Sequence, residues 1–177
     1  MVHCNSTSLC ETLGSVRFIL NDKTGTLTRN ELQLRQLWVN DRLFSPSLPA
    51  GTAYTLPASP ETPSWSTAAE EGSFIQLLRC VVTCNSCVTE NGSLRANNPD
   101  EAALLLGATR FGAMLGARDD RAIHMRLPAG EETWAIESIL AFSSERKRMA
   151  VVARSPAGEI IVFAKVGLMG AFHSGCG

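Results

Sequence analysis

Residues 22–28 of this chain, with the sequence DKTGTLT, combine the groups needed to transfer a phosphoryl group. The carboxylate of Asp22 could attack a phosphorus centre and become an aspartyl phosphate, which splits one difficult transfer into two easier steps. Gly25 lets the backbone approach an anion closely, and Lys23 adds a positive charge beside it. The hydroxyl and amide of Thr24 can donate hydrogen bonds to phosphate oxygens. The segment predicts a phosphate-binding loop with Asp22 as nucleophile; the simpler alternative is a polar turn.

A short apolar run directly before this loop is the element that must position it. Residues 16–20, Val-Arg-Phe-Ile-Leu, are rich in β-branched and aromatic side chains, which predicts a short buried strand. A carboxylate at the end of a buried strand is costly unless it is paired or binds a metal. The position of Asp22 therefore indicates function.

The loop and its flanks resemble a known family. The string DKTGTLT resembles the phosphorylation motif of the P-type ATPases, and LGSV at residues 13–16 and RNEL at 29–32 look like the phospholipid-flippase branch. The resemblance implies an α/β start, the first piece of a haloacid-dehalogenase-like phosphorylation domain. It further implies that ATP phosphorylates Asp22, that Lys23 and Thr24 contact the nucleotide, and that Asp22 and Thr24 help hold Mg²⁺.

Composition limits the classes of function. The 177 residues suit one domain or two small ones, and 16 basic against 17 acidic residues indicate no nucleic-acid partner. The longest apolar stretch, residues 102–117, is interrupted by Arg110, so no membrane span is expected in this segment. Cys84 and Cys87 have metal-type spacing, but no second pair completes a site, and Cys80 and Cys84 favour a buried helix face.

The chain divides into three sections. Residues 1–31 carry the strand and loop, residues 32–165 are expected to form a nucleotide-binding domain, and residues 166–177 are an atypical tail. Alternating apolar and polar residues over 31–39 predict a half-buried strand. Five prolines within residues 45–66 predict a surface insertion without regular structure.

Two helices are expected in the middle section. Apolar spacing predicts one over 68–84, and Asn98 suits the N-cap of a second that runs to residue 106, with Glu101 at the third position of a capping box. The string NPDEAAL at 98–104 also resembles the SPDExAL segment of flippase nucleotide domains, where the glutamate lies near adenine. Capping and nucleotide binding are both open for Glu101.

The last third predicts an antiparallel sheet with flanking helices, hence an α+β nucleotide domain. Its strands are expected over 122–127, 133–142, 149–153 and 160–164, with a turn at 155–158. Between the second and third, FSSERKRM at 142–149 is similar to a segment of the flippase nucleotide domain. The resemblance implies that Phe142 stacks on adenine and Lys147 contacts the nucleotide; a solvated charged turn is the alternative.

Lys165 occupies the place of a lysine that the resemblance puts in the nucleotide pocket. In the family a Gly-Ala-Asp sequence follows that lysine, whereas this chain continues with Val-Gly-Leu from residue 166. The residues after Lys165 therefore depart from the family pattern.

The resemblance implies an ATP-hydrolysing, phospholipid-translocating enzyme in a membrane, with this segment on the cytosolic side. Its partners would be ATP, a phospholipid and the membrane, and they could include an accessory subunit. The later segments that complete the magnesium site do not occur here, so the 177-residue chain alone is expected to be inactive. The alternatives are a haloacid-dehalogenase-type phosphatase and a non-catalytic ATP-binding module. Thr24 stands where such phosphatases usually carry a second acid.

Overall fold

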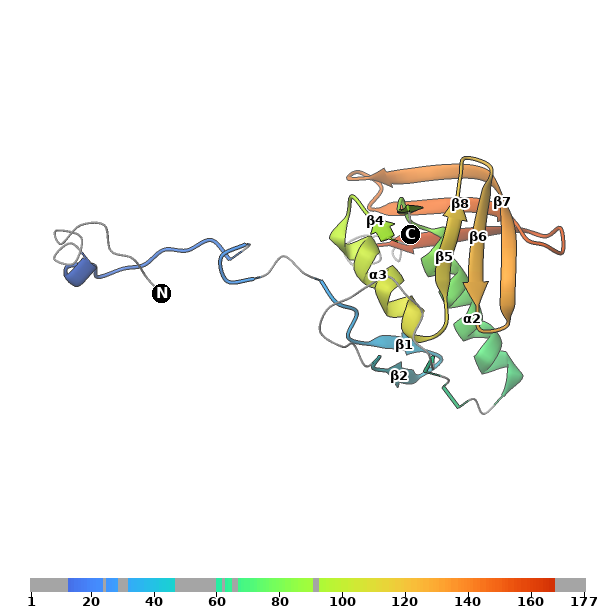
Figure 1. Cartoon of the computed structure of the whole chain (residues 1–177), viewed down its shortest axis with the longest axis horizontal. Coiled ribbons are helices and arrows are strands. Elements are labelled where there is room, and N and C mark those ends of the chain that lie inside the picture. Colours follow the sequence, from blue (N-terminus) through green and yellow to red (C-terminus); the bar gives the residue numbers. More distant parts are fainter. Residues whose placement is uncertain are drawn as a thin grey trace, which may run out of the picture. The chain divides into compact units, whose positions relative to one another are not determined.

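The computed structural model describes residues 13–23, 25–28, 32–46, 60–61, 63–64, 67–90 and 93–167. They belong to two compact units, Met1–Glu31 and Leu32–Gly177 (Figure 1). Thr24, most of the Pro-rich insertion and residues 168–177 lie outside the described residues.

The second unit is built on a five-stranded antiparallel sheet with the strand order β5-β6-β7-β8-β9. This confirms the predicted antiparallel sheet and its four strands. The bounds are β5 Met114–Arg118, β6 Ala122–Leu127, β7 Gly130–Ser143, β8 Arg148–Arg154 and β9 Ile160–Val166. Strand β5 is not among the predicted strands, because its sequence, MLGAR, lacks a clean alternation of apolar and polar residues. Its pairing with β6 is irregular, with a shift of register between Leu115 and Arg118.

The predicted turn between β8 and β9 is confirmed. Gly158 has φ +90°, a conformation that favours glycine, and its N–H donates to the carbonyl of Ser155 at 2.9 Å. Strand β9 continues to Val166, so the first residue of the predicted tail belongs to the sheet.

Both predicted helices are present. Helix α2 spans Ala68–Thr83, and helix α3 spans Pro99–Arg110. The side chain of Asn98 accepts a hydrogen bond from the N–H of Asp100 at 2.9 Å, so Asn98 is the N-cap as predicted. The capping-box role of Glu101 is wrong, because its carboxylate is bonded to Ser86 and Lys165 instead.

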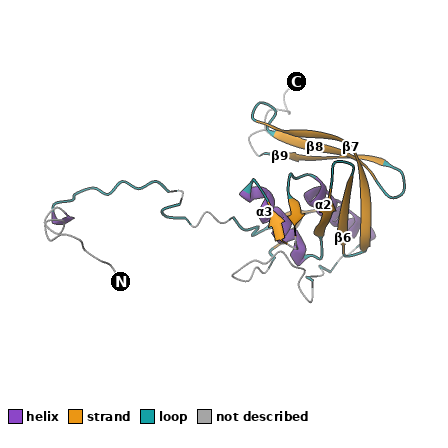
Figure 2. Ribbon diagram, turned by 45° about the horizontal axis from the view of Figure 1, so that its top comes forward, coloured by secondary structure: helices purple, strands orange, loops and turns teal. Residues whose placement is uncertain are grey.

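Helices α2 and α3 lie on the same side of the sheet (Figure 2). The thiol of Cys84, at the end of α2, lies 3.4 Å from the carbonyl of Met149 in β8, and the thiol of Cys80 lies 3.8 Å from the carbonyl of Ala164 in β9. Cys84 is buried and Cys80 half-buried, which confirms the buried helix face. The core between helices and sheet includes Phe74, Leu78, Val82, Leu105, Leu115, Ile123, Trp134, Val151 and Phe163.

Two small hairpins complete the second unit. Strands β1 Leu37–Val39 and β2 Arg42–Phe44 pair with each other, as do β3 Val88–Glu90 and β4 Ser93–Arg95. The strand predicted over 31–39 is therefore too long, since residues 32–36 have no regular structure. Asn40 and Asp41 both have positive φ and form the two-residue turn of the first hairpin. Strand β2 pairs with only three residues of β1, which limits the length of β1.

In the first unit, the buried strand predicted at residues 16–20 is wrong. These residues form no strand and are exposed, with Phe18 84% and Leu20 95% accessible. A strand needs a neighbour to bond its backbone groups. The strand pairings found in the described part of the chain are all in the second unit. The haloacid-dehalogenase-like start stays a prediction.

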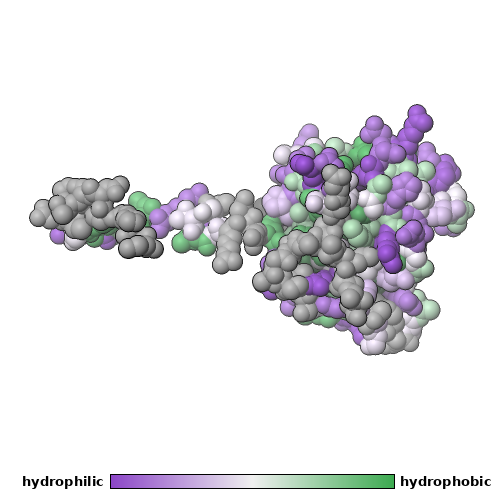
Figure 3. Space-filling view, in the orientation of Figure 1, coloured by the Kyte–Doolittle hydropathy of each residue, from purple (hydrophilic) through white to green (hydrophobic). Residues whose placement is uncertain are grey.

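None of the helices in the described ranges is long and apolar enough to cross a membrane. On the face of the second unit drawn in Figure 3, hydrophilic and hydrophobic residues form a mosaic.

Candidate functional site

The carboxylate of Glu101 is the centre of the site. One oxygen, Oε1, accepts a hydrogen bond from Nζ of Lys165 at 2.6 Å. The other, Oε2, accepts from the backbone N–H of Ser86 at 2.9 Å and from its hydroxyl at 2.6 Å. The side chain of Glu101 is only 7% exposed, whereas that of Lys165 is 31% exposed. The buried carboxylate of Glu101 is thus bonded to the ammonium group of Lys165, which is partly exposed to solvent.

These contacts keep Glu101 ionised. Burial by itself raises the pKa of Glu101, but the hydrogen bonds from Lys165 and Ser86 together outweigh burial and leave its pKa below the ordinary value of 4.5. At neutral pH the group is therefore a hydrogen-bond acceptor without a proton to donate.

The segment after helix α2 brings Ser86 to this carboxylate. The side-chain amide of Asn85 donates to two carbonyls in the last turn of α2, at 2.8 and 3.0 Å. Its carbonyl oxygen accepts from the N–H of Cys87 at 2.9 Å and from the guanidinium of Arg118 at 3.4 Å. Arg118 also donates to the carbonyl of Thr83 at 3.2 Å. Asn85 and Arg118 thereby fix the backbone on both sides of Ser86.

The sheet aligns the other predicted residues of this unit. Arg148 of β8 is paired with Ser143 of β7 and with Val166 of β9, which forms one row across three strands. The chain neighbours of this row are the predicted residues Phe142, Lys147 and Lys165. Adjacent strands are about 4.8 Å apart, so these three residues lie at one end of the sheet within about two strand spacings.

The turn between β7 and β8 holds Lys147 in an unusual backbone conformation. Its φ is +53°, its N–H donates to the carbonyl of Ser143 at 2.8 Å, and its carbonyl accepts from the N–H of Gly167 at 3.0 Å. Lys147 is exposed, and Phe142 is 57% exposed. An aromatic face and an ammonium group are thus accessible at the end of the sheet that carries Lys165.

The residues of the predicted phosphate loop lie in the first unit. Asp22 and Lys23 are exposed there, and Thr24 lies outside the described residues. The structure therefore brings Glu101 into contact with Lys165 and places Phe142 and Lys147 at the same end of the sheet. It does not relate this group to the loop.

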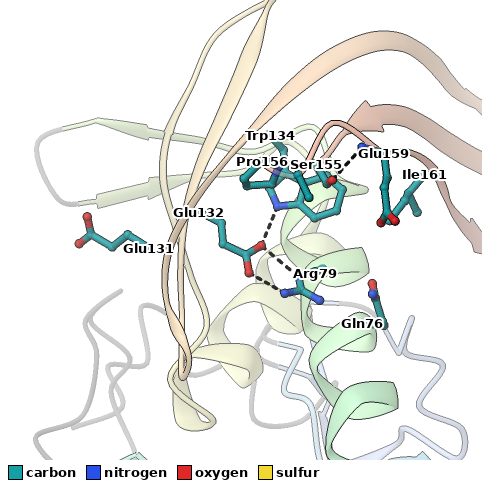
Figure 4. Close-up of a pocket in the computed structure, with 10 residues that line it drawn as sticks. Gln76, Arg79, Glu131, Glu132, Trp134, Ser155, Pro156, Glu159 and Ile161 are labelled. Atoms are coloured by element: carbon teal, nitrogen blue, oxygen red, sulfur yellow. Dashed lines mark hydrogen bonds and ion pairs between the residues drawn. The ribbon is translucent and has the colours of Figure 1, made fainter. Parts of the chain in front are cut away.

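A separate surface cavity of about 340 Å³ lies between α2 and the strands (Figure 4). Its main charged groups bind each other: Arg79 makes two bonds to Glu132, at 2.6 and 3.0 Å, and the indole N–H of Trp134 donates to Glu132 at 2.7 Å. The guanidinium of Arg79 is the main cause that lowers the pKa of Glu132. These hydrogen bonds connect α2 to β7. None of the described site residues that the sequence predicts lines the cavity.

The thiols of Cys80 and Cys87 are protonated at neutral pH in this environment, because burial is the main cause that raises their pKa to about 11. Across the described ranges, no three His, Cys, Asp or Glu residues form a group that could hold a metal ion.

The family model of the P-type ATPase cytoplasmic domain N matches residues 73–168, more than half of the chain, so the chain belongs to the P-type ATPase family. This match covers Glu101, Phe142, Lys147 and Lys165.

Among individual proteins, the chain is similar to phospholipid-transporting ATPases. It is 31% identical over 178 residues to one from Schizosaccharomyces pombe, 32% over 157 residues to phospholipid-transporting ATPase tat-1 from Caenorhabditis elegans, and 29% over 182 residues to phospholipid-transporting ATPase IC from Homo sapiens. These matches cover 92%, 86% and 90% of this chain. The chain spans only 14% of the length of each of these relatives.

Sequence reasoning missed Ser86 and Asn85. Both lie in the Cys-Asn-Ser-Cys segment, in which the sequence pattern indicates only the metal-type spacing of the two cysteines. The available signal was a pair of small polar residues directly after a helix, where side chains often bond the last carbonyls. The contact of Ser86 with Glu101 joins residues 15 positions apart in the chain, which no local pattern reveals.

Proposed function

We propose that residues 32–167 bind ATP and serve as the nucleotide-binding part of an ATP-driven phospholipid transporter. The observation that carries this proposal is the buried, ionised carboxylate of Glu101, bonded to Lys165 at the end of the sheet that also holds Phe142 and Lys147. The family match over residues 73–168 and the printed names of the relatives support it.

Each group has a distinct task in this proposal. Phe142 stacks on the adenine ring, since an exposed aromatic face binds any base through its π surface. Glu101 accepts a hydrogen bond from the base, and Lys165 and Lys147 offer positive charge to the phosphates.

The chemical step is proposed for Asp22. Its carboxylate attacks the γ-phosphorus of ATP, the bond from the γ-phosphorus to the bridging oxygen breaks, and ADP leaves, so that an aspartyl phosphate remains. Asp22 and the main-chain carbonyl of Thr24 would supply ligands to Mg²⁺, which binds a few protein oxygens together with phosphate oxygens and neutralises charge on the phosphates. Asp22 is exposed, which is consistent with access by Mg²⁺ and ATP.

A non-catalytic ATP-binding module is the second candidate for the 177-residue chain by itself. It is favoured by one observation: residues 16–20, which should position Asp22, form no strand and are exposed. In this candidate the chain binds nucleotide and forms no phosphoenzyme.

Titration of the 177-residue chain with ATP tests the nucleotide site. Phe142→Ala should weaken binding about tenfold, because base–aromatic stacking contributes roughly 1–3 kcal/mol. Phe18→Ala is the matched control, since it removes an exposed aromatic side chain in the other unit and should leave affinity unchanged within about twofold. Equal affinities of the wild type and Phe142→Ala would argue against stacking, and a wild type that binds no ATP would refute the proposal.

A further inference from the structure

We propose that Ser86 is a positioning residue that fixes the Glu101 carboxylate and thereby favours a base with an exocyclic amino group over one with a carbonyl at that position. This inference rests on the proposed ATP binding and adds to it a residue that selects the base.

The hydrogen bonds on Glu101 leave little of the carboxylate free. An ionised carboxylate has about four acceptor positions. Lys165 takes one on Oε1, and the N–H and hydroxyl of Ser86 take two on Oε2, where the thiol of Cys87 also donates weakly at 4.0 Å. These donors hold the carboxylate in one orientation and fill Oε2, so about one acceptor position, on Oε1, remains for a ligand.

A fixed acceptor discriminates between bases by their hydrogen-bonding groups. The amino group of adenine is a donor and can fill the remaining position. Hypoxanthine carries a carbonyl oxygen at the same ring position, and two acceptors facing each other repel. Loss of the Ser86 hydroxyl would remove the shortest bond to Oε2 and leave the backbone N–H of Ser86 in its place, so the carboxylate would be held less firmly and both bases would meet a less directional partner.

Ser86 is suited to this task because its own backbone is fixed. Asn85 bonds the last turn of α2 on one side and the N–H of Cys87 on the other. The Ser86 side chain is exposed, so an added methyl group has room. The serine thus combines a rigid main chain with a hydroxyl that is replaceable without repacking the core.

The other charged or titratable groups around Glu101 come from three elements. They are Lys165 of β9, Arg118 of β5, and the thiols of Cys84 and Cys87 after α2. Replacing Ser86 removes none of these groups. A change in the titration of Glu101 would therefore report on the Ser86 hydroxyl itself.

The test compares ATP with inosine triphosphate, which differs at this position of the base, in the 177-residue chain. Ser86→Ala should weaken ATP binding roughly fivefold and change inosine triphosphate binding less than about twofold, because the amino group of adenine loses a well-oriented acceptor that hypoxanthine does not use. Ser86→Thr keeps the hydroxyl and should restore the wild-type ratio. Ser73→Ala is the matched control, since it removes a hydroxyl that donates to a carbonyl on the exposed side of α2.

A second readout needs no nucleotide. NMR titration of the Glu101 carboxyl should show a higher pKa in Ser86→Ala than in the wild type, because one donor to the ionised form is lost. An unchanged pKa, or an unchanged ratio of ATP to inosine triphosphate affinity in a folded Ser86→Ala, overturns the role of Ser86 alone. Absence of ATP binding by the wild type overturns the proposed function instead. If Ser86→Ala does not fold, Ser86→Thr provides the test. A loss of the wild-type preference for ATP over inosine triphosphate in Ser86→Thr, which keeps the hydroxyl, overturns the proposal.

Discussion

At the scale of single residues, the site depends on a carboxylate whose burial is compensated. Glu101 sits among core residues of α3, a position where an unpaired charge would be costly. Lys165 and Ser86 supply three donors, so the charge is tolerated and the acceptor is held in place. The same contacts make this residue matter for stability as well as for ligand binding.

Glu101→Gln should lower the free energy of unfolding at pH 7 by about 1–2 kcal/mol, a modest value because Lys165 remains partly solvated. The folded-state pKa of Glu101 lies below 4.5, so its ionised form stabilises the fold above pH 4.5, and this stabilisation is lost as the pH falls through the folded-state pKa. The difference between wild type and variant should therefore shrink below pH 4.5, as measured by urea unfolding between about pH 3 and 7.

Glu90→Gln is the matched control, because Glu90 pairs with Arg95 on the surface, where both side chains are more than half exposed. It should change stability by less than about 0.5 kcal/mol. A wild-type and Glu101→Gln difference that stays constant with pH would contradict the assigned ion pair.

At the scale of elements, α3 is positioned by close contact with the segment before β1. A Cβ atom added to Gly107 would lie 2.3 Å from Cδ2 and 2.7 Å from Cβ of Leu34. Glycine is otherwise unfavourable inside a helix, so its presence here follows from this approach. Because Glu101 is two turns earlier on α3, a displacement of this helix would also move the carboxylate.

Gly107→Ala should destabilise the chain by about 1–3 kcal/mol, since Leu34 must shift away from the added methyl group. Gly72→Ala provides the matched control within α2, where a Cβ would meet nothing within 4 Å. It should stabilise the chain by about 0.5–1 kcal/mol through the helix preference of alanine. Thermal unfolding of both variants measures the two effects, and equal shifts in the same direction would refute the close approach at Gly107.

At the scale of the whole molecule, nucleotide binding and phosphoryl transfer are proposed for different units. Among the described residues, the proposed ATP-binding residues and the buried core lie in Leu32–Gly177, whereas Asp22 lies in Met1–Glu31. The chain spans 14% of the length of the relatives named above, so the transport reaction in their names stays a proposal for this chain.

Removal of residues 1–31 should leave ATP affinity unchanged within about twofold, because no proposed nucleotide contact of the second unit is lost. In a version extended to the full length of the relatives, Asp22→Asn should also bind ATP but form no hydroxylamine-sensitive phosphoenzyme, since the nucleophile is gone. Phosphate labelling that persists in Asp22→Asn would show that another residue is the nucleophile. Loss of ATP binding on truncation, in a chain that remains folded, would place part of the site in the first unit.

The sequence alone determined the elements whose signals are local. Asn98 before a proline and an apolar run specified the start of α3, and proline and glycine at 156 and 158 specified the turn between β8 and β9. Four strands of the sheet were also predicted, one of them, over 133–142, from alternating side chains. The motif resemblance also identified the family, which the family model then showed.

Only the tertiary structure decided where Glu101 points and whether residues 16–20 form a strand. The capping-box pattern around Glu101 is real in the sequence, but Lys165, 64 residues away, and Ser86 offer its buried carboxylate stronger partners than a backbone N–H. Residues 16–20 have the composition of a strand, yet a strand exists only when another strand bonds its edge. Both outcomes depend on groups distant in the chain, and a local pattern carries no information about them.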